Sequence, residues 1–74
     1  MSDEEKKYCD QFLDIAKAND YSFNVVFAMG AIAFDKGTTE EVSIKILKHM
    51  IDLATKYKNE DDFVAEVEKA YIEQ

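Results

Sequence analysis

A stretch of twelve residues at positions 23–34, FNVVFAMGAIAF, contains no charged side chain and a single polar one, Asn24. Each residue of an α-helix adds about 1.5 Å, so this stretch would form a helix about 18 Å long. Crossing the hydrocarbon core of a bilayer takes roughly 20 residues, so the stretch is too short to span a membrane. It must therefore be covered by the rest of the chain or by a partner.

The distribution of side chains around this helix predicts where it lies. At about 100° per residue, Phe23, Phe27 and Phe34 share one face and aliphatic residues occupy a second, so the helix is apolar around most of its circumference. A helix of this kind is normally buried in the middle of its protein. We therefore expect residues 23–36 to form the central helix of the fold, contacted by the other helices.

Gly30 lies inside this apolar helix, where a glycine is about 1 kcal/mol less favourable than an alanine. A glycine is tolerated at such a position when another helix must approach closely. That helix would come from this chain or from a second copy, since a chain of 74 residues has little material with which to cover both faces. The predicted packing or homodimer surface comprises Ala28, Gly30, Ala31 and Ala33.

The rest of the chain carries helix signals at regular intervals. It has no proline and only two glycines, a composition that favours helices over a turn-rich β fold. Ser2 with Glu5 matches a capping box, in which each residue binds the backbone N–H of the other. Ser22 and Asn59 are favourable N-caps. These signals predict helices that begin at residues 3, 23 and 60.

The third helix is predicted to begin near Thr38 or Thr39. Thr38 with Glu41 matches a second capping box, and Gly37 suits the end of the preceding helix. Because the connections are short, sequential helices should be antiparallel neighbours. The sequence thus predicts a single all-α domain over residues 1–74, a compact bundle of four short antiparallel helices at about 3–18, 23–36, 39–57 and 60–73.

The charge balance excludes one large class of partners. The formal net charge is −7, and all nine basic residues are lysines. Nucleic-acid affinity rests largely on basic side chains that neutralise phosphates, and arginine is the usual bidentate reader of guanine. Both features argue against nucleic acid as the partner. The single cysteine gives no disulfide framework, which favours a reducing, cytoplasmic location.

Catalysis is not expected either. His49, the only histidine, falls on the polar side of the third helix, so a solvated imidazole is the better interpretation. Cys9 falls on the apolar side of the first helix, more than a turn from its start, which favours a buried thiol over an activated one. No cluster of ligands has the spacing of a metal site. We predict no enzyme activity, no metal and no cofactor.

Acidic residues gather at the C-terminal end of the chain. Residues 59–74 carry six carboxylates against one lysine, a net charge of −5. A solvated exterior accounts for this pattern, and so does an acidic face that steers the protein onto a basic partner. The predicted partner-binding face comprises Asp61, Asp62, Glu66, Glu68 and Glu73.

These observations favour a small, acidic, non-catalytic module that binds another protein with a basic surface, as an inhibitor, adaptor or antitoxin-like regulator. Small inhibitors encoded by phages or mobile elements offer an analogy. The first alternative is a helical module that assembles with copies of itself. The second is a transcriptional regulator, because the spacing of Ala33, Gly37 and Thr39 resembles a helix-turn-helix. Glu40 and Glu41 would then face DNA phosphates, which they repel.

Overall fold

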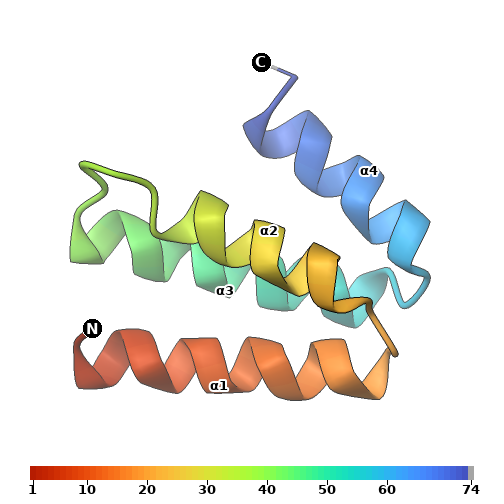
Figure 1. The fold of residues 1–74 in the computed structure, drawn as a ribbon, viewed down its shortest axis with the longest axis horizontal. Helices are drawn as coiled ribbons and strands as arrows, with labels where there is room; N and C mark the ends of the chain where they lie inside the picture. Colours follow the sequence, from red (N-terminus) through yellow and green to blue (C-terminus); the bar gives the residue numbers. More distant parts are fainter. Residues whose placement is uncertain (74) are drawn as a thin grey trace.

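The computed structural model describes residues 1–73, and this part of the chain folds into helices joined by short loops (Figure 1). The helices are α1 (Asp3–Ala18), α2 (Phe23–Ala33), α3 (Glu40–Lys56) and α4 (Glu60–Tyr71). This confirms the predicted four-helix, all-α architecture. The first helix has the predicted bounds, α3 and α4 are shorter by two residues each, and α2 ends three residues early.

Side-chain caps begin each helix. The Ser2 hydroxyl accepts from the Glu5 backbone N–H at 3.1 Å, and the Glu5 carboxylate accepts from the Ser2 N–H at 2.8 Å, which confirms the first capping box. Ser22 and Asn59 cap α2 and α4 as predicted. These caps depend on residues no more than three apart, so they follow from local sequence alone.

The connection between α2 and α3 departs from the prediction. The C-cap of α2 is Phe34, and Asp35 opens a turn in which its carbonyl accepts from the Thr38 N–H at 3.0 Å. Gly37 sits at the third position of this turn with φ of +87°, a conformation that favours glycine. The Asp35 carboxylate also accepts from the next backbone N–H, at 2.8 Å. Aspartate competes in this way with helix hydrogen bonds, so α2 stops before it.

The predicted capping box of Thr38 with Glu41 is wrong, because the N-cap lies one residue later. Thr39, not Thr38, is the N-cap of α3, and its hydroxyl accepts from the Val42 N–H at 3.3 Å. Thr38 is already part of the preceding turn, because its N–H is bound to the Asp35 carbonyl. The position of this turn therefore determines at which residue α3 begins.

The central helix is α3, and the prediction that residues 23–36 form the centre is wrong. Helix α3 packs against α1, α2 and α4, whereas α2 packs mainly on α3 (Figure 1). The reason is the breadth of the apolar side of α3. Its buried residues come from successive turns, and half-buried apolar residues beside them also pack against the core: Ser43, Ile44, Leu47, Met50 and Ala54 are buried, and Ile46, Ile51 and Leu53 are half-buried. Within residues 1–73, no helix is long and apolar enough to cross a bilayer.

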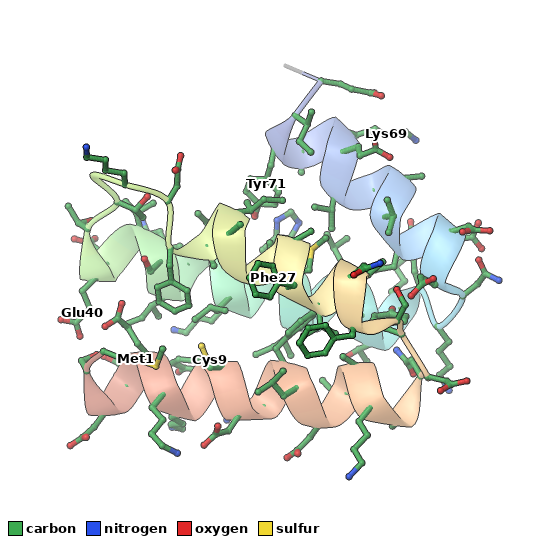
Figure 2. All side chains as sticks on the ribbon, viewed as in Figure 1. Met1, Cys9, Phe27, Glu40, Lys69 and Tyr71 are labelled. Atoms are coloured by element: carbon green, nitrogen blue, oxygen red, sulfur yellow. The ribbon has the colours of Figure 1, made fainter. Side chains whose placement is uncertain are left out.

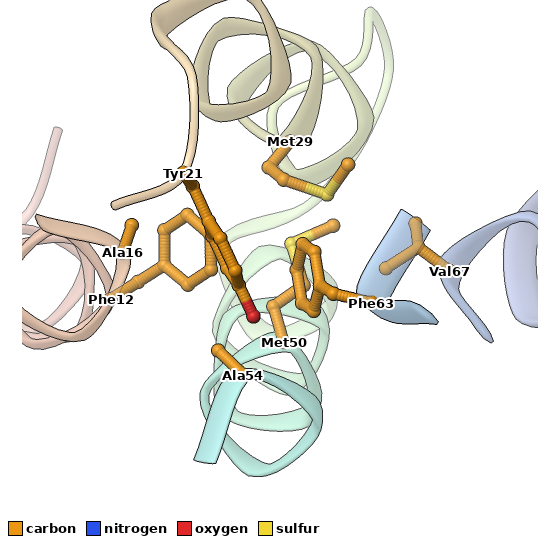
Figure 3. Packing of buried hydrophobic residues seen from close by; sticks show 8 residues of the cluster. All are labelled: Phe12, Ala16, Tyr21, Met29, Met50, Ala54, Phe63 and Val67. Carbon is orange, nitrogen blue, oxygen red and sulfur yellow. The ribbon is translucent and has the colours of Figure 1, made fainter. Parts of the chain in front are cut away.

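Side chains from all four helices meet in one core beside α3 (Figure 3). Phe63 of α4 is fully buried, and its ring stacks on that of Tyr21 with centroids 4.7 Å apart. Met29 of α2 and Met50 of α3 fill the space beside these rings. Burying a side chain of this size stabilises a fold by about 1.5–3 kcal/mol, so Phe63 is a main anchor of α4.

Polar contacts tie the α1–α2 loop to the junction of α3 and α4. The Asn19 side-chain amide donates to the Ala54 carbonyl at 2.9 Å. The Tyr21 hydroxyl donates to the Tyr57 carbonyl, and the Ser22 backbone N–H donates to the Glu60 carboxylate. As a result α2 and α4 begin close together, and they diverge toward their C-terminal ends (Figure 1).

Candidate functional site

Two phenylalanines on α2 point away from the protein. Phe23 is 80% exposed and Phe27 is 71% exposed, with ring centroids 6.2 Å apart. Figure 2 shows Phe27 on the near side of α2, with α3 behind that helix. Helix α2 has no charged residue over its whole length. A contiguous exposed apolar surface on a small protein commonly marks an interaction site.

A shallow apolar hollow separates α2 from α1. Its volume is about 80 Å³, and Cys9, Leu13, Gly30 and Phe34 are among the residues that line it. A methyl group added at Gly30 would meet no atom within 4 Å. No helix of this chain therefore uses the glycine for close approach. A close approach at Gly30 would have to come from a second copy of the protein.

The other predicted small residues lie in different environments. Ala33 is fully buried under α2, whereas Ala28 and Ala31 are exposed. The four small residues therefore do not form one continuous packing surface. Phe23, Phe27 and Ala31 make up the exposed face of α2, which we call the α2 outer face, whereas Ala28 lies on the side of α2 that faces α4.

A larger groove lies between α2 and α4. Its volume is about 320 Å³, and its walls are aliphatic on both sides, with Val25, Ala28 and Ile32 on α2 facing Val64 on α4 and the C-cap residue Ile72. Among residues 1–73, the only polar side chains that line it are Asn24 and Glu68. We call it the α2/α4 groove. Its walls consist of helix side chains, so a ligand would be held mainly by apolar contact.

The predicted acidic residues are spread around α4. Asp61, Asp62 and Glu73 are exposed, while Glu68 is half-buried at the α2/α4 groove. Glu66 is engaged within the chain, because Lys69 donates to its carboxylate at 3.1 Å and raises its own pKa by doing so. The structure thus places one carboxylate of the predicted acidic face at the groove and leaves three in open solvent.

His49 and Cys9 have surroundings that differ in part from the predictions. His49 is exposed, yet its Nδ1 lies 2.6 Å from the Tyr71 hydroxyl, so the ring links α3 to the end of α4. Cys9 is half-buried rather than fully buried. Burial raises the pKa of its thiol, and Asp10 and Glu5 nearby raise it further, which disfavours the reactive thiolate. Within residues 1–73, no three side chains of metal-ligating type come together.

Comparison with protein-family models, with curated proteins and with solved structures finds no match for this chain.

Sequence reasoning missed the exposure of Phe23 and Phe27, which it assigned to a buried helix. A helical wheel shows how apolar each face is but not which face finds a neighbour. The length of the chain already predicted spare apolar surface on this helix, because three other short helices cannot cover every face of it, but length does not tell which face stays open. The α2/α4 groove has no counterpart in local sequence, since its walls come from helices about forty residues apart.

Proposed function

We propose that this protein is a non-catalytic module that binds another protein through the α2 outer face. The observation that carries the proposal is the exposure of Phe23 and Phe27 on a helix without charge. Aromatic side chains are enriched among the residues that dominate binding energy at interfaces. An inhibitor, an adaptor or an antitoxin-like regulator would each work by such binding.

The charge of the chain supports the choice of partner. With a net charge of −7, the protein attracts basic surfaces at long range and repels nucleic acid. The helix-turn-helix alternative gains no support from the fold, because α2 runs back along α3 (Figure 1), whereas the helices of that motif cross at about 90–120°. A reducing, cytoplasmic setting suits a chain with a single free cysteine.

The experiment is a quantitative pull-down from native lysate with mass spectrometry. The double variant Phe23→Ser, Phe27→Ser should lose the captured partner. The matched control is Val42→Ser, which changes an apolar side chain that is 45% exposed on α3, and it should retain the partner. Equal capture by the wild type and the double variant would refute the role of the α2 outer face.

Self-association is a second candidate function, favoured by the uncharged, exposed surface of α2. The same phenylalanines would then face those of a second copy, in an isologous contact. Sedimentation velocity separates the two candidates. A monomer at micromolar concentration argues against assembly, whereas a dimer that dissociates in the Phe23→Ser, Phe27→Ser variant would replace the proposal of a different partner.

A further inference from the structure

The α2/α4 groove is an apolar site, and among the residues that the structure describes its only charged lining residue is acidic. Glu68 is half-buried at the α4 wall. Among the described residues, its carboxylate has no ion pair or hydrogen bond, unlike that of Glu66, which is paired with Lys69. A half-buried carboxylate beside aliphatic side chains gains most from a cation that arrives with an apolar ligand.

The position of Glu68 on its helix adds a second charge. Asp61 precedes it by seven residues, so the two carboxylates lie on the same face of α4, two turns or about 10.5 Å apart. Asp61 is exposed. Helix α2, the opposite wall, has no lysine that could neutralise either carboxylate. Asp61 precedes the residues of α4 that line the groove, so it adds a second negative charge at one end, while α2 carries no charge.

We infer that the α2/α4 groove binds an amphipathic helix whose aliphatic stripe is flanked by lysine or arginine residues seven positions apart. The inference rests on the proposed function, because it specifies the partner that such a binding module takes. The aliphatic stripe of the partner lies between α2 and α4, and its basic residues pair with Asp61 and Glu68. Binding of this kind is the helix-in-groove mode of peptide recognition.

Other occupants fit the groove less well. A peptide that binds by strand addition needs the free backbone edge of a sheet, and the described part of the chain contains no strand; a polyproline II peptide docks on aromatic side chains, whereas the lining of this groove is aliphatic. A second copy of this protein carries the same net charge of −7, so two such grooves would place carboxylates opposite carboxylates. A membrane with anionic lipids repels the same charges.

The probe is a synthetic peptide of about 15 residues, the length at which an isolated helix becomes marginally stable. It is built from leucine, alanine and lysine, with leucines three and four residues apart and two lysines seven apart beside them. A twin peptide has glutamates in place of those two lysines. Titration calorimetry at physiological salt should show binding of the lysine peptide, with the twin at least about tenfold weaker.

Two protein variants locate the site. Glu68→Lys turns an attraction into a repulsion and should weaken the lysine peptide about tenfold. The control Asp14→Lys makes the same change of charge at an exposed, unpaired carboxylate on α1, and it should alter the affinity less than about twofold, because surface charges more than about 8 Å apart are screened. Positions 14 and 68 both lie in the C-terminal half of their helices, where the macrodipole favours a positive charge, so the two substitutions are matched in this respect.

Ala28→Leu tests the groove without changing charge. Ala28 is exposed at the α2 wall, so a leucine there occupies the groove while leaving the core intact, and the peptide should again lose about tenfold. Equal weakening by Glu68→Lys and Asp14→Lys would overturn the inference, and so would full binding to Ala28→Leu. A partner captured through Phe23 and Phe27 but insensitive to Glu68→Lys would refute the groove alone and leave the proposed function standing.

Discussion

Gly30 offers a sharp test of whether the hollow between α1 and α2 is free in the protein. The residue lies inside α2, and a methyl group at its Cα would meet no atom within 4 Å. Alanine is about 0.8–1.0 kcal/mol more favourable than glycine in a helix interior. Because the added methyl causes no clash, Gly30→Ala should raise the free energy of unfolding by nearly this full amount. For a domain of this size that corresponds to a rise in Tm of about 4–8 °C.

The matched control is the other glycine. Gly37 has φ of +87°, a conformation that costs an ordinary L-residue about 1–2 kcal/mol, so Gly37→Ala should lower the stability although open space surrounds its Cα as well. The two variants make the same chemical change and are expected to have opposite signs. Urea denaturation followed by far-UV circular dichroism measures both.

A loss of stability in Gly30→Ala would refute the reasoning. It would mean that something approaches Gly30 closely, and the remaining source is a second molecule. The midpoint of unfolding would then depend on protein concentration, because association stabilises the folded state by mass action. A gain in stability that is independent of concentration agrees with a hollow between α1 and α2 that no second molecule fills.

Two further predictions concern the core. Phe63→Ala removes a fully buried ring that stacks on Tyr21 and should lower the free energy of unfolding by about 3–5 kcal/mol. A urea titration should therefore find most of this variant unfolded before urea is added, whereas Phe63→Leu should keep a cooperative transition. Burial raises the pKa of the Tyr21 hydroxyl above its usual value of 10.0, so its stabilising contribution is complete below about pH 10 and is lost as the pH rises through the raised pKa. Tyr21→Phe should cost about 1 kcal/mol at neutral pH by removing the bond to the Tyr57 carbonyl, and should flatten the alkaline loss only in part because burial also raises the pKa of Tyr71. An unchanged alkaline profile in that variant would contradict the role of Tyr21.

Much of the secondary structure could be predicted because its causes are local. The caps at Ser2, Ser22 and Asn59 each act within three residues, and the helices they begin have the predicted starts. The errors came where two local signals competed. Asp35 begins a turn that ends α2 before Gly37. Thr38 belongs to that turn, so Thr39 is the N-cap of α3.

The candidate site was predictable only in part, since it combines one local property with several distant ones. The acidic character of α4 is visible in its composition. Whether Glu66 pairs with Lys69, and whether Glu68 stands beside an apolar groove, depends on rotamers and on the position of α2. The net charge of a segment gives the excess of acidic over basic residues, but it does not tell which carboxylates lie at a shared surface.

The sequence by itself determined that this protein is a set of short helices, because capping, the absence of proline and apolar periodicity act over one or two turns. Only the tertiary structure decided which helix is central and which apolar surface stays open. Helix α3 is central because half-buried apolar residues flank its buried stripe, and it packs against the three other helices. The other three helices cover one side of α2 and not the other, so Phe23 and Phe27 remain exposed.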